Sequence, residues 1–446
     1  MSWKSRFPKH LNIITNYHII MLKNEININF LFKNKYTKLI EFFISNPLNE
    51  YYVNEILNRI EISPQVLCNS LKELVDIGVL LSSKKANSIY YRLNNKNNVV
   101  ETLKKIIKPL TYKDAGVDID LANSAVNRIK KYVKQTYNSN VLSNVGSFGG
   151  LYRINQDNVL VSSTDGVGTK LKLAFLTNKH DTVGQDLVNH CVNDILVMGA
   201  KPLFFLDYIG CGKIYPEVIE EIVKGLSIAC KENNCALIGG EIAEMPGLYK
   251  EKEYDLASFI VGTVKRKKII DGSKVKRGDM VIGLSSSGLH TNGYSLAIKV
   301  LLENAKLGLR DKPKGLGCTP KEELMKVHIS YLKPVSEILD KFEVKAMAHI
   351  TGSGLVGNIP RILPNNLSVE LNKKSWKINP IFSLIQKLGN INDDEMYKVF
   401  NMGIGFVIIV DKNIAKKILN ILMKYSFKSQ IIGRVINGDR KIIFND

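Results

Sequence analysis

The sequence predicts an α/β protein with two larger domains that follow a smaller one. At 446 residues the chain is longer than one ordinary hydrophobic core can support. From about residue 111 onward, strand-like runs alternate with helical runs, and the charged stretch Lys265–Arg277 separates two such series. We expect a disordered leader at 1–35, a small domain at 36–94, a linker helix at 95–110, and α/β domains at 111–264 and 265–446.

The small domain shows the pattern of a helix-turn-helix followed by a hairpin. Two short helical patterns, Tyr36–Ser45 and Val53–Arg59, precede Ser63-Pro64, which is a favourable helix start. The next helix keeps one apolar face and ends at Gly78, and two strands with a polar turn follow. This order resembles the winged helix-turn-helix fold of transcriptional regulators. Leu67, Leu71 and Leu74 lie on the apolar face of the third helix, and Lys84 and Lys85 lie at the tip of the hairpin.

Charge allows a nucleic-acid interpretation of this small domain without requiring it. The whole chain has a formal net charge of +20, and the first 110 residues account for +8 of it. Gln65, Asn69 and Lys72 point away from the apolar face and could contact base edges, with the wing lysines on phosphate. A solvated lysine surface and a protein-contact module are the alternatives.

The alternation of strand-like and helical runs predicts the elements of the two larger domains. In the first series we expect strands at 159–162, 203–209, 235–238 and 256–264, and helices at 184–198 and 217–232. The second series comprises segments at 280–284, 295–302, 321–340, 344–350, 406–410 and 414–425.

Cysteine usage and hydropathy predict a cytoplasmic protein. The six cysteines are dispersed without a Cys-x-x-Cys pair, which is typical of reduced thiols. No run approaches 18 apolar residues, so we expect no membrane span. The leader lacks the long apolar core and cleavage site of a secretory signal, and Met21 is an alternative start.

Four polar, glycine-rich signatures follow or border apolar runs. Glycine lets the backbone approach a ligand closely, and the charged residues within such loops mark where ligand charge lies. Four of them within one region indicate an active site assembled from several strand ends. They are Ser163–Lys170, Gly239–Gly247, Ser286–Tyr294 and His349–Gly354.

Phosphate chemistry fits these signatures, although no standard motif is complete. Asp165–Lys170 has the order Gly-Thr-Lys instead of that of a P-loop, and Gly352–Gly357 matches G-x-G-x-x-G without the following acid. Asp194 borders an apolar helix stripe and therefore needs a cation or strong donors. Together with Asp165 and Asp114 it suggests a magnesium site that bridges nucleotide phosphates, with a helix salt bridge as the alternative.

These motifs together resemble one family, the phosphoribosylformylglycinamidine cyclo-ligases, also called aminoimidazole ribonucleotide synthetases. The resemblance spans about 111–446 in one order. It implies two α/β domains, a homodimer that closes a β-barrel, and ring closure of formylglycinamidine ribonucleotide with ATP and Mg²⁺ to give aminoimidazole ribonucleotide, ADP and phosphate. Besides the four signatures, the matching segments are Tyr112–Asp118, His180–Gly184, Cys191–Asp194, Phe204–Tyr208 and Glu395–Gly403.

The resemblance also implies roles for individual residues. Catalytic groups are His290, Glu241, His349 and Lys113. Nucleotide-binding groups are Asp165, Gly166, Gly168, Thr169, Lys170, Asn193, Thr351, Gly352 and Gly354. Asn292 and Glu244 are substrate-binding, and Asp114, Asp165 and Asp194 are the metal ligands. Each histidine has the alternative of a satisfied hydrogen-bonding side chain.

This sequence departs from the family pattern at four places. Ile242 replaces a threonine, Thr291 replaces a serine conservatively, Ser353 replaces a glycine, and Val327–Ser330 replaces the usual segment that begins Pro-Thr. None removes a charged group, so we expect activity.

The alternative function is a DNA-binding regulator whose synthetase-like region senses a purine intermediate or nucleotide.

Overall fold

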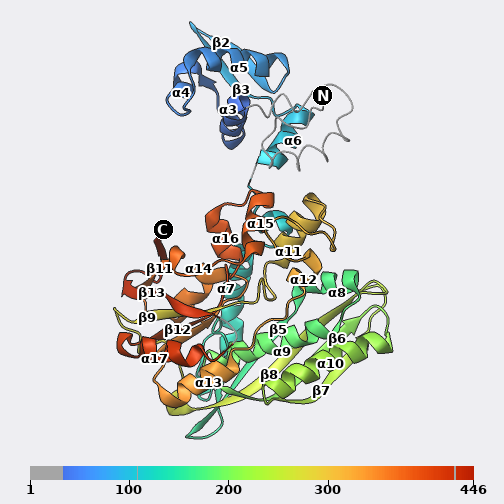
Figure 1. Cartoon of the computed structure of the whole chain (residues 1–446), viewed down its shortest axis with the longest axis vertical. Coiled ribbons are helices and arrows are strands. Elements are labelled where there is room, and N and C mark those ends of the chain that lie inside the picture. The colour runs from blue at the N-terminus through green and yellow to red at the C-terminus, as the bar shows by residue number, and fades with distance from the viewer. Residues whose placement is uncertain (1–33, 108, 426–427, 446) are drawn as a thin grey trace. The chain divides into compact units, whose positions relative to one another are not determined.

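The computed structural model describes residues 34–107, 109–425 and 428–445, and most of the predicted leader lies outside them. The chain divides into two compact units, Met1–Leu110 and Thr111–Asp446 (Figure 1). None of the described helices is both long and apolar enough to cross a bilayer.

Within its described residues, the first unit contains three helices, a small antiparallel sheet and a final helix. The sheet has the strand order β1-β3-β2, in which β2 and β3 form the hairpin. The helices and the hairpin lie close to the predicted positions, whereas the short strand β1 was not predicted and the interpretation as a winged helix stays a prediction. In chain order they are α3 (Asn34–Ser45), β1 (Tyr51–Tyr52), α4 (Val53–Leu57), α5 (Pro64–Asp76), β2 (Leu80–Lys85), β3 (Ser88–Leu93) and α6 (Asn98–Ile107).

Helix α5 carries the core of this unit. Leu67, Leu71 and Leu74 are fully buried, as their helical spacing predicts. Ser63 occupies the N-cap position before Pro64, but its side chain makes no capping hydrogen bond. The helix start therefore depends on proline at the first position and on burial of the leucines.

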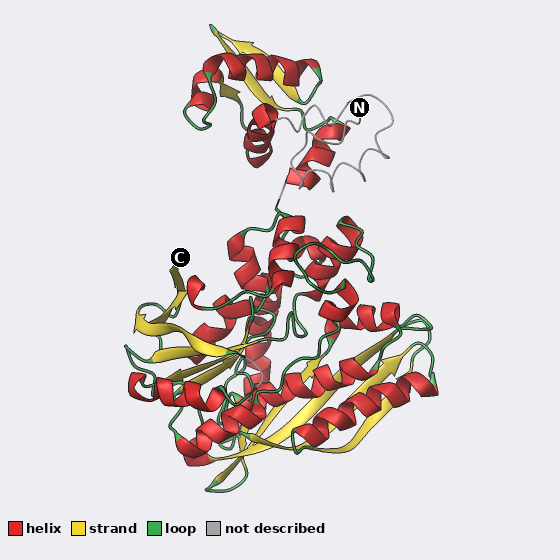
Figure 2. Cartoon of the chain, viewed as in Figure 1, coloured by secondary structure: helices red, strands yellow, loops and turns green. Residues whose placement is uncertain are grey.

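The N-terminal domain of the second unit is a five-stranded sheet with helices α9 and α10 on one face (Figures 1 and 2). The strand order is β4-β5-β8-β6-β7; neighbours are antiparallel except β6 and β7. Burial alternates along β8, so the sheet has one covered and one open face. The elements are η2 (Lys113–Ala115), α7 (Ile119–Gln135), β4 (Gly150–Arg153), β5 (Asn158–Gly166), η3 (Gly168–Lys170), α8 (Leu171–Thr177), α9 (Asp181–Leu196), β6 (Lys201–Cys211), α10 (Pro216–Glu232), β7 (Ala236–Glu244) and β8 (Tyr254–Lys265).

The C-terminal domain is built on a six-stranded sheet with the order β10-β12-β9-β13-β11-β14. Strand β12 is buried along its whole length, as expected for an inner strand with both faces covered. The elements are β9 (Met280–Ser285), α11 (Tyr294–Ile298), η5 (Lys299–Asn304), α12 (Pro320–Leu324), α13 (Leu332–Lys341), β10 (Ala346–His349), α14 (Gly354–Asn358), η6 (Ile359–Ile362), β11 (Leu367–Asn372), α15 (Pro380–Gly389), α16 (Asp393–Val399), β12 (Ile404–Val410), α17 (Lys412–Leu422), β13 (Ser429–Asn437) and β14 (Ile442–Asn445).

The segment expected at 321–340 is interrupted in the structure. Helix α12 ends at Leu324 and α13 begins at Leu332, and the residues between them run along α9 of the N-terminal domain. We call residues 325–331 the crossing segment. Its backbone groups hydrogen-bond to side chains of α9 instead of continuing a helix, which explains the interruption.

Two glycines set the close approach of α9 and α10. A Cβ atom on Gly225 would lie 1.9 Å from the carbonyl oxygen of Asp181, and one on Gly184 would lie 2.4 Å from that of Ile222. Both clashes are with backbone, which cannot rotate away. The spacing of these helices over the sheet therefore requires glycine at both positions.

Gly225→Ala should separate α9 from α10 and lower the free energy of unfolding by about 3 kcal/mol, because the added methyl group overpacks a backbone contact. Gly150→Ala is the matched control, since its Cβ would lie 3.7 Å from the nearest atom. Chemical denaturation of both variants measures the difference. Equal stabilities would contradict this account of the helix contact.

Candidate active site

Strand pairing brings two of the glycine-rich signatures together. Strands β9 and β10 each pair antiparallel with β12, so they run parallel and end at the same edge of the sheet. Ser285 and His349 are aligned with Ile404 and Phe406, two residues apart on β12. The Ser286–Tyr294 and His349–Gly354 loops therefore begin side by side.

Helix α9 and the end of β5 meet these loops from the N-terminal domain. His190 and Asp194 lie one turn apart on α9, with 3.9 Å between His190 Nε2 and Asp194 Oδ2. Asp165, at the end of β5, places Oδ2 2.7 Å from His190 Nε2. His349 Nδ1 lies 2.8 Å from Asp194 Oδ1. Carboxylates and imidazoles of both domains thus form one cluster.

Hydrogen bonds connect the members of this cluster in a continuous series. Thr291 Oγ1 lies 2.6 Å from His190 Nδ1 and 3.3 Å from His328 Nδ1. His328 Nε2 in turn lies 3.0 Å from His349 Nε2. The hydrogen-bonded series runs from His190 through Thr291, His328 and His349 to Asp194, and all of these residues are buried. Asp165, which is partly exposed, joins it through the ion pair with His190.

The carboxylates set the charge of His190. Burial opposes a charged ring, but attraction to Asp165 and Asp194 outweighs it and raises the pKa of His190 to about 9. Burial alone would raise the pKa of Asp165, yet the charge of His190 and its hydrogen bond hold that pKa below its ordinary value. This end of the cluster is an imidazolium–carboxylate pair at neutral pH.

The other three histidines at this site, His290, His328 and His349, are neutral. Burial lowers the pKa of His290 and His328 well below the ordinary value, and it also lowers that of His349 despite the neighbouring Asp194. His290 stacks on His328 with 4.0 Å between ring centroids and adopts a left-handed backbone with φ of 63°. Such a conformation is strained for a non-glycine residue and is found often at functional sites.

Lys170 is fully buried in an ion pair with Asp186. Its Nζ lies 2.7 Å from Asp186 Oδ2 and donates to the carbonyl of Lys326 at 2.7 Å. Asp186 Oδ1 also accepts the backbone N–H of His328. Burial lowers the pKa of Lys170 and raises that of Asp186, and their mutual attraction opposes both shifts. In this structure the ammonium fastens the crossing segment to α9, and the phosphate contact predicted for Lys170 stays a prediction.

Gly168 and Thr169 of the first signature border an open cavity. Thr169 Oγ1 lies 2.8 Å from Ser295 Oγ, and both residues with Gly168 border a cavity of about 300 Å³. Asp165 is 43% exposed at its side chain, and Gly166 donates its N–H to that carboxylate. Asp165 is therefore the accessible member of the buried cluster.

The His349–Gly354 loop is held by its own polar contacts. Thr351 Oγ1 donates to Asn358 Oδ1 at 3.2 Å, and Gly354 has a positive φ of 57°. A Cβ on Gly352 would lie 3.1 Å from Asn292 Oδ1, so the two loops touch there. Asn193 is buried and binds the crossing segment through Ile329 O and Tyr331 N. The structure thus places Asn193, Asn292, Thr351, Gly352 and Gly354 around the cluster.

Four predicted residues lie apart from the cluster. Glu241 and Glu244 are exposed on the edge strand β7, and Glu244 accepts the N–H of Ile214. Lys113 is exposed and paired with Asp118. Asp114 accepts hydrogen bonds from Thr111, and among the described residues the group suited to a metal is His190, Asp194 and His349, without Asp114.

Sequence reasoning missed several members of the cluster. His190 was not singled out, although its position four residues before Asp194 on a helix is a recognisable ligand spacing. His328 was noted only as a departure from the family pattern. Thr291 was noted only as a conservative departure within the Ser286–Tyr294 signature, and Asp186 has no sequence signal of its own. The roles of both residues depend on contacts between domains.

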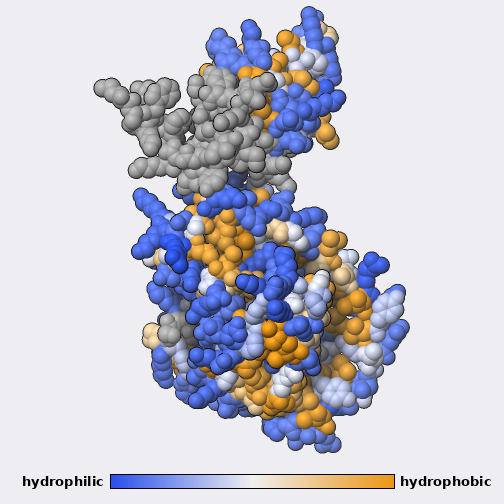
Figure 3. All heavy atoms as spheres, turned by 90° about the vertical axis from the view of Figure 1, so that its right-hand side faces the viewer, coloured by the Kyte–Doolittle hydropathy of each residue, from blue (hydrophilic) through white to orange (hydrophobic). Residues whose placement is uncertain are grey.

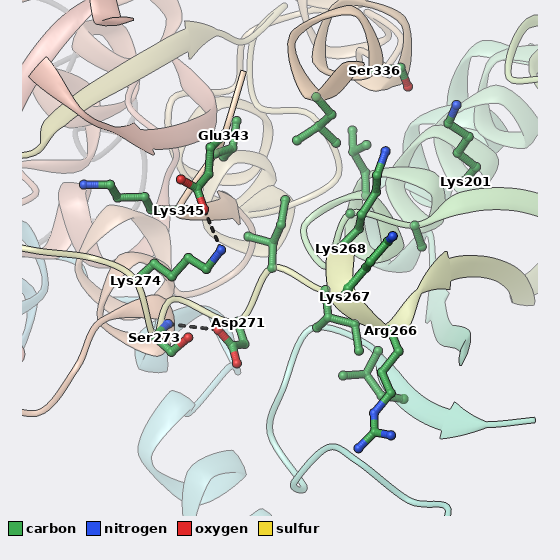
Figure 4. Close-up of a pocket in the computed structure, with 18 of the residues that line it drawn as sticks. Lys201, Arg266, Lys267, Lys268, Asp271, Ser273, Lys274, Ser336, Glu343 and Lys345 are labelled. Atoms are coloured by element: carbon green, nitrogen blue, oxygen red, sulfur yellow. Dashed lines mark hydrogen bonds and ion pairs between the residues drawn. The ribbon is translucent and has the colours of Figure 1, made fainter. Parts of the chain in front are cut away.

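A separate cavity of about 540 Å³ lies where the N-terminal domain, the 266–274 stretch and α13 meet. Figure 4 shows Lys201, Lys267 and Lys268 on one side and the Lys274–Glu343 ion pair on the other. None of the residues that line it is among the predicted site residues. We therefore place the candidate active site at the histidine–aspartate cluster.

Comparison with known proteins agrees with this two-domain architecture. Residues 146–264 match the family described as "AIR synthase related protein, N-terminal domain", and residues 276–445 match its C-terminal counterpart. The solved structure of a HypE–HypF complex has a TM-score of 0.52 at 16% identity, with 71% of this chain and 95% of that chain covered. The fold and the paired domains define a protein of the AIR synthase-related class.

Curated relatives narrow that class. Phosphoribosylformylglycinamidine cyclo-ligase of Bacillus cereus (strain G9842) is 53% identical over 331 residues, which cover 73% of this chain and 96% of the relative. The enzyme of that name from Acetivibrio thermocellus is 54% identical, with 73% and 97% covered. The chain belongs to the phosphoribosylformylglycinamidine cyclo-ligase family, as the sequence motifs predicted.

Lys170→Met should lower the free energy of unfolding by about 3–5 kcal/mol, because it leaves Asp186 buried without its cation. The Asp186→Asn substitution removes that charge and keeps an acceptor for the N–H of His328. The double variant Lys170→Met/Asp186→Asn should therefore recover part of the loss. Thermal and denaturant unfolding of the single and double variants measures this coupling, and additive losses would contradict it.

Proposed function

We propose that this chain catalyses the ATP-dependent ring closure of formylglycinamidine ribonucleotide to aminoimidazole ribonucleotide in purine biosynthesis. The observation that carries the proposal is the identity of 53% over 96% of a cyclo-ligase's length. The cluster at the domain junction supports it, because it joins groups from three of the four glycine-rich signatures.

The reaction needs an activated amide oxygen and a positioned nucleophile. ATP transfers its terminal phosphoryl group to the formyl amide oxygen. The amidine nitrogen then attacks that carbon, loses a proton, and displaces phosphate as the imidazole ring closes. Most of the catalysis in such a transfer comes from positioning and charge stabilisation.

The chain's own groups suit these two tasks. The His190 imidazolium places positive charge next to the exposed carboxylate of Asp165, close to the open loop Gly166–Thr169. Neutral imidazoles at His328 and His349 form a hydrogen-bond path through which a proton can be held or moved. We likewise propose that His290 and His349 act as catalytic groups and that Asn292 binds the substrate.

The family implies a divalent cation with the nucleotide. The carboxylates of Asp165 and Asp194 are oxygen donors suited to Mg²⁺, and we propose them as its ligands. When bound, Mg²⁺ neutralises phosphate charge. Asp114 makes its contacts with Thr111 instead and is a weaker candidate.

We also propose that the second unit forms a homodimer through the open face of its N-terminal sheet. Phe259 is 49% exposed on this face, where Leu206 and Tyr208 are half-buried, and helix α7 has no buried residue. Figure 3 shows hydrophobic patches among charged residues on the side where β6 and β7 lie in Figure 1. Burial of these side chains would favour association.

The small N-terminal unit has no assigned ligand. Lys85 of its hairpin is paired with Glu50, so Lys84 is the wing lysine left for phosphate contact. DNA binding, a winged-helix role and the cytoplasmic location stay predictions. A chain that binds substrate or ATP without turnover would favour the regulator interpretation over the enzyme.

Purified protein should convert formylglycinamidine ribonucleotide and ATP to aminoimidazole ribonucleotide, measured by product formation and coupled ADP release. Asp165→Asn should lower the rate about 100-fold with only a small drop in the melting temperature, because the side chain is partly exposed and Asp194 still faces His190. Asp157→Asn, an exposed carboxylate at the other end of β5, is the matched control. Full activity of Asp165→Asn would contradict the assigned role.

Light scattering at assay concentration should give twice the 50.1 kDa chain mass. Phe259→Asp should shift the protein toward monomer, because it places a charge in the centre of the apolar face. Met423→Asp, at an exposed position of the C-terminal domain, should leave the dimer intact. A monomer with full activity would refute the proposed interface.

A further inference from the structure

The cavity of about 540 Å³ lies at the opposite end of the N-terminal sheet from Asp165. Asp165 is aligned with Ser258 on β8, whereas the cations that line the cavity follow directly after Lys265, the last residue of β8. Seven residues of extended strand separate these two levels, which corresponds to about 23 Å. The cationic wall of the cavity is therefore separate from the accessible end of the candidate active site.

Strand register brings cations of two elements to one wall of this cavity. Lys201, the first residue of β6, is aligned with Thr263 near the end of β8. The three residues after β8 form the 3₁₀ turn η4 (Arg266–Lys268), and all three are cationic. Figure 4 shows Lys201, Lys267 and Lys268 reaching to the same side, whereas Arg266 points the opposite way. Three ammonium groups from β6 and η4 therefore share one side of the cavity.

The backbone of η4 is fixed by its neighbours. Arg266 donates its N–H to the carbonyl of Asp157 at 2.8 Å. Gly199 has a left-handed φ of 79°, and a Cβ there would lie 3.1 Å from the carbonyl oxygen of Lys268. A turn held in this way presents its side chains in a preorganised arrangement, which lowers the cost of ordering them around a ligand.

The positive charge of this wall is not compensated within the protein. Six cationic and three acidic side chains line the cavity as a whole. On the far side Lys274 is paired with Glu343. Within the described part of the chain, Lys201 and the three residues of η4 form no ion pair. Like charges held close together repel one another, so an anion bound between them would be stabilised.

Apolar side chains form much of the remaining lining. Leu151 and Leu196 are buried, whereas Ile270, Leu339 and Phe342 are half-buried and keep part of their surface free. Apolar surface in a concave site takes up the apolar part of a ligand, and an aromatic ring packs well against a planar group. The volume lies within the range of about 300–1,000 Å³ that is usual for small-molecule sites. A simple solvated lysine surface has no such enclosed apolar lining.

Helix α13 adds a hydroxyl and a carboxylate to the cavity. Ser336 and Asp340 lie one turn apart on α13, and both line the cavity. A carboxylate accepts hydrogen bonds from hydroxyl groups, and this is the usual way in which proteins bind the hydroxyls of a ribose. The cavity thus combines groups for phosphate, for sugar hydroxyls and for an apolar ring.

We propose that this cavity is a second ligand site of the chain and that it binds a ribonucleoside phosphate. The phosphate lies against Lys201, Lys267 and Lys268, the ribose against Asp340, and the base against Phe342. Inorganic phosphate uses only the first of these contacts, so it binds more weakly than the nucleotide. Binding at this cavity does not depend on the proposed ring closure, because none of these residues belongs to the candidate active site.

The experiment locates the binding of adenosine monophosphate (AMP) on the full-length protein. Lysines are acetylated with acetic anhydride in the presence and absence of AMP, and mass spectrometry gives the modification of each lysine. We expect AMP to protect Lys201, Lys267 and Lys268 several-fold. Lys276, an exposed lysine outside the cavity, should be modified equally in both samples. Equilibrium dialysis with labelled AMP then gives the affinity.

Variants separate the phosphate contact from the contact with the base. Lys267→Glu/Lys268→Glu should weaken AMP binding about 10- to 100-fold, because it replaces charge-assisted hydrogen bonds by repulsion. Lys276→Glu/Arg277→Glu makes the same charge change at exposed positions outside the cavity and should bind AMP normally. Phe342→Ala should weaken AMP binding and leave protection of Lys201 by inorganic phosphate unchanged. Circular dichroism checks folding, and the η4 variant keeps the test valid if Phe342→Ala does not fold, because η4 is exposed.

Three outcomes would overturn the proposal. They are unchanged acetylation of the three lysines at millimolar AMP, equal AMP affinities of the two charge-reversal variants, and equal protection by inorganic phosphate and by AMP. Protection by a DNA duplex but not by AMP would assign the cationic wall to nucleic acid instead. The result is independent of the enzyme assay, since AMP can protect these lysines whether or not the protein closes the imidazole ring.

Discussion

The buried ion pair between Lys170 and Asp186 is the constraint on which the candidate active site depends. It joins the end of the first glycine-rich signature to α9, and both side chains also hold backbone groups of the crossing segment. Desolvation makes either charge unfavourable alone, so the two must be buried together. His328 is thereby fixed between His290, His349 and Thr291. Lys170 thus organises the junction between domains, and the phosphate contact that the family pattern suggests for it stays a prediction.

Charge within the junction is unevenly distributed. At one end His190 and Asp165 form an ion pair, and Asp165 reaches the open loop. Toward the interior, burial keeps the imidazoles of His290 and His328 neutral. This gradient places an accessible carboxylate beside a hydrogen-bonded histidine network. A nucleotide fits at the exposed end of this cluster and a cation fits at its carboxylates. One cluster therefore supports both the proposed nucleotide contact and the proposed cation site.

Within a single chain, the Gly239–Gly247 signature lies outside this cluster. Glu241 and Glu244 lie on the edge strand β7, which is separated from β5 by β6 and β8. Glu241 is aligned with Tyr208 on the open face of the sheet, and Glu244 lies at the end of the same strand, away from the domain junction. A site completed across a subunit interface would account for this placement. The proposed dimer therefore gives the Gly239–Gly247 loop a role that the isolated chain does not.

The sequence alone determined the two α/β domains, the family, and the loops that carry Asp165, His290 and His349, because these follow from local periodicity and from motifs contiguous in the chain. The comparisons confirm the family and the fold. Contacts between distant segments required the tertiary structure. The approach of residue 328 to residue 349, and of residue 190 to residue 291, depends on strand pairing and on the crossing segment. Burial then decided which ionisable groups are charged, since the pKa of a side chain depends on surroundings that its neighbours in sequence do not specify.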